Sequence, residues 1–306
     1  MIYIDPPLWP AHGTHFSHLV SDTSLAELHE FAAASGIPLR AFDHDHYDVP
    51  LRRYEDLVAS GAKPVDGGTL VRALITGGLR IPARERAASL VHPLRGRWDT
   101  LVPGAEDLGA ELLNRWGEPH RRYHDRRHLL QVLEALHSLG CAERPVLLAA
   151  WFHDAVYDGV PGSDEEASAV LAEELLPPAG VPDAETAEVS RLVRLTAAHN
   201  PADGDEYGKL LCDADLAVLG RDRAAYDRYA ADVRQEYRHV DDNTFRAGRS
   251  AVLESLLDRG KGLFRTARGE ELWGTAARAN LARELASLAD RRADADPENG
   301  VRPARG

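Results

Sequence analysis

The chain has 306 residues and a formal net charge of −13 at pH 7, with 44% hydrophobic and 28% charged residues. This composition is ordinary for a globular protein, and the length favours two domains. The negative charge argues against general nucleic-acid binding, because phosphate backbones require a basic surface, but a few arginines could still hold a small phosphorylated substrate. The sequence offers no apolar run of the ~20 residues that a membrane span needs and no secretory leader. With only Cys141 and Cys212, these features predict a cytoplasmic protein without a disulfide framework.

Residues 1–80 alternate short β-like runs with short helical patterns. The run IYID ends at Asp5 and is followed by two prolines. A helix is expected near 24–35, with Asp22 or Ser24 as its N-cap and Gly36 at its C-terminus. An extended run IPLRAFD, short helices over 50–60 and 67–77, and a strand at AKPV complete the pattern. This alternation predicts a small α/β domain.

The rest of the chain has a helical pattern. Residues 81–104 contain several prolines and glycines and are predicted to form a linker or an edge segment. From residue 105 to about 288, apolar residues recur at helical spacing, which predicts an all-α domain of roughly eight helices. The polar residues 289–306 are predicted to be a disordered tail. The expected fold class is therefore α+β with two domains, a small α/β module followed by an all-helical domain.

Four side chains of the helical part stand out because apolar residues surround them. His128 lies in RRHLLQVLEAL, the pair His153-Asp154 follows VLLAAWF, and Asp215 lies in LLCDADLAVLG. A carboxylate buried in such a setting is costly unless it is paired or binds a metal ion. Imidazole and carboxylate together suit a divalent ion, and ligands from three helices leave positions open for water. The pattern therefore predicts a catalytic metal site.

Each of these residues also has a simpler interpretation. A single histidine in an apolar helix, such as His128, is more often a hydrogen-bonded core residue, and a His-Asp pair is common by chance. Asp215 could cap a helix or pair with an arginine, as could its neighbour Asp213. The combined order, with the histidine and aspartate residues each set in an apolar helical segment, favours the metal site over these alternatives.

The stretches RRYHDRRHLLQVLEAL, AAWFHDAVYDG, SDEEASAVLAEELL, LVRLTAAHN and LLCDADLAVLG resemble the HD superfamily of metal-dependent phosphohydrolases. The most similar subgroup is known mainly as predicted metal-dependent phosphohydrolases, and the resemblance spans roughly residues 105–288. It implies an HD-type helical fold and a divalent metal ion, with Mn, Mg, Fe, Co, Ni and Zn not distinguished. It implies hydrolysis of a phosphate ester or anhydride of a small molecule, a nucleotide by default. The implied metal ligands are His128, His153, Asp154 and Asp215.

Further residues are predicted to assist the chemistry. A bound ion would lower the pKa of a water molecule and polarise a phosphoryl oxygen, and Asp154 is expected to orient that water. His124, four residues before His128, is expected on the same helix face. His199 resembles a position where some relatives carry an additional site histidine, and Glu166 could act as an acid or base. The alternatives are a surface histidine and an exposed glutamate at a helix start.

Four arginines lie beside the first motif, and the planar guanidinium group suits phosphate oxygens. A solvated helix face explains most such clusters, so only one or two of them are expected to bind substrate, and Arg122 and Arg126 are predicted for that role. The cluster consists of Arg121, Arg122, Arg126 and Arg127.

Two other functions remain open at this point. An HD-type di-iron oxygenase would need extra ligands, which His124 and His199 could supply. A non-catalytic sensor would bind a nucleotide in the helical domain without turnover. A homodimer is possible in each case.

The N-terminal domain is rich in histidine and aspartate. Residues 1–92 hold seven of the 14 histidines, including those of HGTHFSH and DHDHYD. This pattern suggests a second metal or phosphate site at the ends of strands. Because alternate residues of an extended segment point to opposite faces, they cannot all share one ion, and a merely polar loop is the alternative. Residues 2–80 resemble an uncharacterised bacterial domain family, domain of unknown function 4031, which implies no known activity. The residues concerned are His12, His15, His18, His29, His44, His46 and His92, with Asp5, Asp22, Asp43, Asp45 and Asp48.

Overall fold

The computed structural model describes residues 1–43, 45–77, 79–80, 87–160 and 162–294. The chain divides into two compact units, Met1–His92 with Arg223–Val233 and Pro93–Asp222 with Arg234–Gly306. Each unit is described by itself. Within the described ranges, none of the helices has both the length and the apolar character required to cross a membrane.

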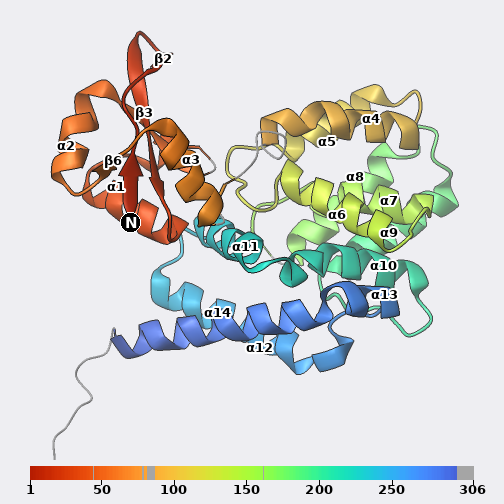
Figure 1. The fold of residues 1–306 in the computed structure, drawn as a ribbon. Coiled ribbons are helices and arrows are strands. Elements are labelled where there is room, and N and C mark those ends of the chain that lie inside the picture. The colour runs from red at the N-terminus through yellow and green to blue at the C-terminus, as the bar shows by residue number, and fades with distance from the viewer. Residues whose placement is uncertain (44, 78, 81–86, 161, 295–306) are drawn as a thin grey trace, which may run out of the picture. The chain divides into compact units, whose positions relative to one another are not determined.

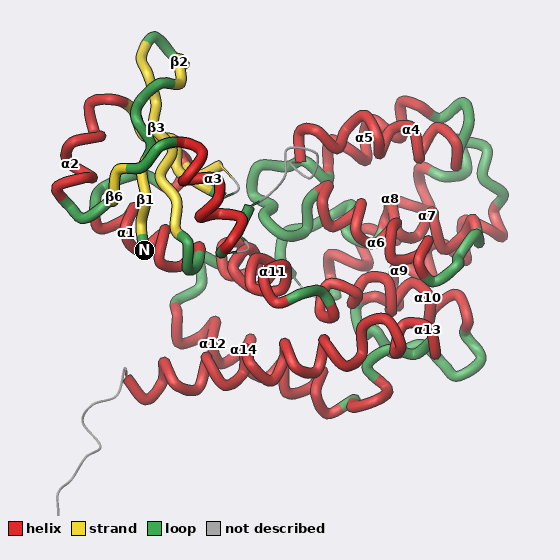
Figure 2. The backbone as a smooth tube through the Cα atoms, viewed as in Figure 1, coloured by secondary structure: helices red, strands yellow, loops and turns green. Residues whose placement is uncertain are grey.

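The N-terminal unit contains a six-stranded sheet with the order β4-β5-β3-β1-β6, and β2 pairs with β3 beside this path. All strand pairs are antiparallel except β1 and β6, which are parallel. In the described residues, strands occur only in this unit, as the yellow segments of Figure 2 show. The strands are β1 (Ile2–Ile4), β2 (Trp9–Ala11), β3 (Thr14–Ser21), β4 (Phe42–Asp43), β5 (His46–Pro50) and β6 (Lys63–Pro64).

Three helices complete this unit: α1 (Leu25–Ala34), α2 (Tyr54–Ala59) and α3 (Gly67–Thr76). Ser24 caps α1 by accepting a hydrogen bond from the backbone of Glu27. Of the two predicted N-caps, Asp22 and Ser24, the structure therefore has Ser24. Apolar residues of the strands and the helices form one core, which includes Ile4, Leu19 and Leu28. The small α/β domain is confirmed.

One predicted strand in this unit differs from the structure, and three strands were not predicted. The run IPLRAFD is mostly a 3-10 turn and leaves only β4 as a strand. Strands β2, β3 and β5 were not predicted from the sequence, although β3 and β5 lie in the interior of the sheet. β3 mixes serines and histidines with its apolar residues, and β5 contains His46 and Asp48, so neither has a clear hydrophobic pattern.

The second unit is helical throughout its described residues (Figure 1). Helix α11 (Arg223–Glu236) contributes only its C-terminal end to this unit. The other helices are α4 (Val91–Leu101), α5 (Glu106–Arg115), α6 (Arg126–Ser138), α7 (Arg144–Phe152), α8 (Ser163–Leu175), α9 (Asp183–Thr196), α10 (Glu206–Asp215), α12 (Asp242–Asp258), α13 (Ala267–Gly269) and α14 (Thr275–Asp294).

Two predicted boundaries are wrong. Residues 91–101 form helix α4 rather than a linker, because Leu94 and Trp98 bury an apolar face there. Residues 289–294 continue helix α14 rather than beginning a tail. The other parts of these two predictions, residues 81–86 and 295–306, lie outside the described residues.

Buried tryptophans pack around the end of α7, next to His153. The indole of Trp98 donates to the carbonyl of Ala105 at 2.8 Å, and the indole of Trp116 donates to the carbonyl of Trp151 at 2.9 Å. The ring of Trp116 lies 5.3 Å from that of His153. These contacts fix the end of α7, where His153 follows.

Candidate metal centre

Three helices of the second unit bring four polar side chains together. His128 lies in the first turn of α6, which Asp125 caps, and Asp215 is the last residue of α10. His153 and Asp154 were expected within an apolar helix, but they lie directly after α7 ends at Phe152. All four side chains therefore lie at helix ends, and His153 and Asp154, which follow α7, are free of the helical side-chain spacing.

The donor atoms of the four residues face one another. The Nε2 atoms of His128 and His153 are 3.1 Å apart. Asp215 Oδ1 lies 3.0 Å from Nε2 of His128 and 3.7 Å from Nε2 of His153. Asp154 Oδ2 lies 3.6 and 3.3 Å from the same two nitrogens. The donor atoms of His128, His153 and Asp215 all lie within 4.8 Å of one another.

These separations fit a single ion. Two ligand atoms that are each ~2.1 Å from one ion lie about 3.0 Å apart in neighbouring octahedral positions and about 3.4 Å apart in a tetrahedron. The five separations given above run from 3.0 to 3.7 Å. The four side chains would need to move by only a few tenths of an ångström to bind one ion.

The charges in the cluster call for a cation. Burial raises the pKa of the carboxyl groups of Asp154 and Asp215, but the neighbouring histidines, His153 foremost, together outweigh burial and lower both pKa values below their ordinary range. Burial lowers the pKa of His128. Burial also lowers the pKa of His153, yet its two carboxylate neighbours raise it well above the ordinary value. Two carboxylates that favour their ionised form thus face a buried space, and a divalent ion bound there could take the place of the proton on His153 in balancing their charge.

Hydrogen bonds hold the His153-Asp154 segment in place. His153 Nδ1 donates to the carbonyl of Ala150 at 2.8 Å, which leaves Nε2 to face the cluster. This is the usual outer contact of a metal-binding histidine. The guanidinium of Arg121 is fully buried and donates to the carbonyls of His124, Asp154 and Ala155 at 3.0, 2.7 and 3.2 Å. Arg121 therefore ties the turn before α6 to the turn after α7.

His124 lies beside the cluster. The sequence predicted it on the same helix as His128, but it lies before helix α6 begins. It belongs to the turn that precedes the helix cap Asp125. The carboxylate of Glu236 accepts hydrogen bonds from the backbone of Arg122, Tyr123 and His124 at 2.8, 2.9 and 2.9 Å. It also accepts from His124 Nδ1 at 2.7 Å. One buried carboxylate therefore shapes the whole turn.

The same pair of groups is joined by Tyr157. Its hydroxyl donates to Glu236 at 3.0 Å, and its ring stacks on the imidazole of His124. Burial alone would raise the pKa of Glu236, but His124 and the backbone donors outweigh it and lower that pKa to about 2. Burial lowers the pKa of His124, and Glu236 outweighs burial and raises it. The ionised carboxylate of Glu236 therefore favours the protonated form of His124.

His199 lies beside the cluster and contacts Asp215. Its Nε2 lies 2.7 Å from Asp215 Oδ2, whereas Asp215 Oδ1 faces His128. The backbone of His199 has a φ of +47°, a left-handed conformation that is uncommon outside glycine. Arg259 donates to the carbonyls of His199 and Ala198 at 2.9 and 3.1 Å and supports this turn. Such strain is often found at functional sites.

The two aspartates of CDADL have different roles in the geometry. Asp213 is fully buried and accepts hydrogen bonds from the backbones of Arg265 and Thr266 and from the Thr266 hydroxyl. It fastens α10 to the segment that leads into α13. Asp215, rather than Asp213, stands beside the imidazoles.

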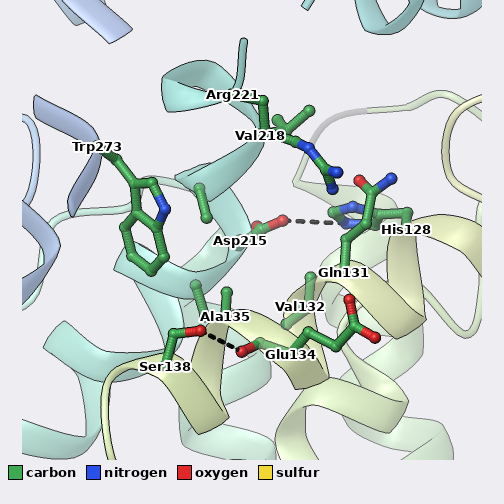
Figure 3. Close-up of a pocket in the computed structure, with 12 residues that line it drawn as sticks. His128, Gln131, Val132, Glu134, Ala135, Ser138, Asp215, Val218, Arg221 and Trp273 are labelled. Atoms are coloured by element: carbon green, nitrogen blue, oxygen red, sulfur yellow. Dashed lines mark hydrogen bonds and ion pairs between the residues drawn. The ribbon is translucent and has the colours of Figure 1, made fainter. Parts of the chain in front are cut away.

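Two cavities adjoin the cluster. The first has a volume of about 190 Å³, and its lining includes His128, Asp215, Gln131 and Arg221 (Figure 3). The second has a volume of about 150 Å³. The lining of the second includes His124, Asp154, His199 and Asp215, together with Asp164 and Glu165. Both cavities contain carboxylates and imidazoles, but only the lining of the first includes a guanidinium, that of Arg221.

Three predicted site residues are engaged elsewhere. Glu166 is exposed, and its carboxylate pairs with Arg194 at 2.7 Å, so the structure does not bring it to the cluster. Arg126 donates to the carbonyl of Leu113 and packs against Gly117. The Arg122 guanidinium donates to the carbonyls of Pro119 and Arg121 within its own turn. Residue spacing could not reveal on which side of the turn each arginine would lie.

Three important residues were missed by the sequence analysis. Arg221 follows α10 after a 3-10 turn, and its only signal is its place just beyond the DADL motif. Arg121 was recognised as part of a basic cluster but not as the buried member. Glu236 lies 112 residues from His124 in the sequence, and no local pattern connects them.

The N-terminal unit holds a second His/Asp cluster, formed by His18, His46 and Asp48. Burial lowers the pKa of His46, but Asp45 and Asp48 outweigh burial and raise it to about 9. His44 lies outside the described residues. Among the residues that the structure describes, two clusters could therefore hold a metal ion.

Comparisons with known proteins concern only the N-terminal unit. Residues 2–76 match the sequence model of a family described as protein of unknown function (DUF4031). Neither the search of curated proteins nor that of solved structures found a match. These comparisons give no evidence for an assignment of residues 105–288 to the HD superfamily. The family match supports the N-terminal α/β domain as a unit of its own.

Proposed function

We propose that the helical unit is a metal-dependent hydrolase of phosphate esters or anhydrides, of the HD type that its motifs resemble. The observation that carries the proposal is the convergence of His128, His153, Asp154 and Asp215, with donor separations of 3.0–3.7 Å. Small phosphorylated molecules, nucleotides among them, are the substrate class.

The two cavities suggest how the substrate is oriented. An anionic phosphate is held better in the first cavity, where Arg221 offsets the carboxylates of Glu134 and Asp215. The second cavity has four carboxylates in its lining and no arginine or lysine. Arg221 offers paired N–H donors that match phosphate oxygens. The phosphoryl group therefore approaches the centre from the side of His128.

The second cavity supplies the water. A divalent ion held by the four side chains would provide Lewis acidity, which activates a water molecule and polarises a phosphoryl oxygen. Asp154 orients the attacking water, and Arg121 fixes the backbone of Asp154 through its carbonyl. His124, held by Glu236 through its Nδ1 atom, lines this cavity.

The test is metal-dependent turnover by the full chain. Protein stripped of metal is reloaded with single divalent ions and screened over nucleotides and sugar phosphates. His153→Ala should lower turnover at least about a hundredfold, because the variant loses a ligand of the ion. His137→Ala, which removes an exposed histidine of α6, should retain it. Failure of every ion to support turnover, or full activity of His153→Ala, would refute the proposal.

A second experiment tests the orientation of the substrate. Arg221→Ala should raise KM roughly tenfold or more, since a charged hydrogen bond to phosphate contributes about 1.5–3 kcal/mol. Arg223→Ala, two residues further on and exposed, should leave KM unchanged. Equal values of KM in both variants would contradict the assignment of the phosphate to this cavity.

One observation favours a second candidate, a di-iron oxygenase. The two oxygens of Asp215 face different histidines, His128 and His199, as they would if this carboxylate bridged two ions. The count of ions in the helical unit separates the two functions. Two iron ions in aerobically purified protein, with no phosphatase activity, would support the oxygenase.

A further inference from the structure

The N-terminal sheet carries a row of polar side chains across three neighbouring strands. His18 of β3 is paired with Asp48 of β5 in the strand register, and the next residue pair is Leu19 and Tyr47. Asp5 follows β1, and its backbone N–H donates to the carbonyl of His18. His46 precedes Asp48 by two residues in the same strand. Since side chains alternate between the faces of a sheet, His18, His46 and Asp48 share one face.

Two buried carboxylates orient the two imidazoles. Asp5 Oδ2 lies 2.9 Å from His18 Nδ1, and Asp45 Oδ1 lies 2.7 Å from His46 Nδ1. The side chains of these aspartates are 4% and 0% exposed. A carboxylate accepts the Nδ1 proton, so the lone pair of each neutral imidazole lies on Nε2. Proteins orient metal-binding histidines through such contacts.

Both Nε2 atoms face the carboxylate of Asp48. The distances to Asp48 Oδ1 are 3.9 Å from His18 and 3.5 Å from His46. The donor atoms of the three residues all lie within 4.8 Å of one another. A common ion at ~2.1 Å requires separations of about 3.0–3.4 Å, and the half-exposed Asp48 side chain can move to close the difference.

We propose that His18, His46 and Asp48 form a mononuclear site for a divalent transition-metal ion in the N-terminal unit. Two imidazoles and one carboxylate suit Fe²⁺, Co²⁺ and related ions rather than Mg²⁺ or Ca²⁺, which prefer oxygen ligands. Three protein ligands on one side leave further positions for water or a small ligand. Two of the three side chains are partly open to solvent, which gives the ion and such a ligand access. The sequence analysis expected a site at strand ends, whereas this site lies within β3 and β5.

The site does not depend on the function of the helical unit. Its ligands come from the unit that matches the family of unknown function, within residues 2–76. Asp45 also accepts from Arg80 at 3.2 Å, which holds the carboxylate in place for His46. The two sites can therefore be tested separately in one chain.

The experiment counts Co²⁺ ions in the full chain, because the N-terminal unit includes Arg223–Val233 and cannot be excised as residues 1–92. Metal-free protein is titrated with Co²⁺, and the bound ion is measured by elemental analysis and by its visible absorption. Asp48→Asn should remove one ion per chain, both in the wild type and in a His153→Ala background. His18→Gln should do the same, and His15→Ala, on the same strand but exposed, should not. A thousandfold excess of Mg²⁺ should leave this ion bound.

The measured quantity is the difference of one Co²⁺ ion between each variant and its parent. This difference does not depend on how many ions the helical unit binds. Circular dichroism identifies any variant that does not fold, and Asp48→Asn carries the test because the Asp48 side chain is 46% exposed. If Asp48→Asn and His18→Gln both bind as much Co²⁺ as their parents, the site is wrong. In that case the imidazoles are hydrogen-bonded links between the carboxylates rather than metal ligands.

Discussion

Replacing Glu236 by glutamine tests the network around the turn before α6. The amide oxygen can still accept from the three backbone N–H groups, but the NH2 group then faces His124 Nδ1 and the Tyr157 hydroxyl. A charge-assisted bond contributes about 1.5–3 kcal/mol, and a buried donor without an acceptor costs about 1–3 kcal/mol. We expect Glu236→Gln to lower the free energy of unfolding by about 3 kcal/mol at pH 7.

The dependence on pH gives an independent estimate of this magnitude. In the folded protein the pKa of Glu236 is about 2, below its ordinary value of 4.5, and this difference corresponds to about 3 kcal/mol. A lowered pKa stabilises the fold fully above pH 4.5, and the stabilisation is lost as the pH falls toward 2. The gap between wild type and Glu236→Gln should therefore narrow from pH 5 to pH 2.

The assay is urea unfolding at pH 7, 5, 4 and 3, followed by tryptophan fluorescence. Four of the five tryptophans report on the helical unit. Glu111→Gln is the control, since its exposed ion pair with Arg115 is worth about 0.5 kcal/mol or less. A difference below about 0.5 kcal/mol at pH 7, or one that stays constant down to pH 3, would refute the role of Glu236. The tryptophans of the helical unit are Trp98, Trp116, Trp151 and Trp273.

Three further substitutions have expected outcomes. Gly109→Ala would place its Cβ 2.2 Å from the buried ring of Trp98 and should lower the free energy of unfolding by about 1–3 kcal/mol. Gly96→Ala, within α4 and with no atom within 4 Å of its Cβ, should raise the free energy of unfolding by about 0.5–1 kcal/mol. Equal effects of the two substitutions in thermal unfolding would contradict this packing. Arg121→Lys should cost about 2–4 kcal/mol, because one ammonium group cannot reach three separate carbonyls, and a stability unchanged in urea would count against this. Asp213→Asn should cost about 1–3 kcal/mol and keep its metal content by elemental analysis; loss of the ion would make Asp213 a ligand.

The sequence predicted those features that depend on local pattern. The helices around His128 and Asp215 follow from apolar residues at helical spacing, and the polar residues that interrupt this pattern are the ones that the structure brings together. Strand β3 was not predicted, because its serines and histidines hide the alternation of a strand that is buried by its neighbours.

Long-range contacts could not be predicted in this way. Glu236 meets the turn at His124 only because the helices of the unit pack together, and packing is not encoded in the residues near either one. The choice among the arginines failed for a related reason. Arg121 and Arg122 are neighbours, yet the turn buries one guanidinium and leaves the other near the surface.

Because the N-terminal unit is discontinuous in the sequence, it cannot complete its folding early during synthesis on the ribosome. Ala231 packs against the core of that unit, so its last helical segment emerges from the ribosome long after the sheet. Synthesis of the intervening Pro93–Asp222 takes roughly 7–26 s at 5–20 residues per second. During that interval the sheet exists without Arg223–Val233, and the apolar surface that Ala231 later covers is available to chaperones. The segment Pro93–Asp222 is therefore synthesised before the N-terminal unit can finish folding. This segment supplies His128, His153, Asp154 and Asp215.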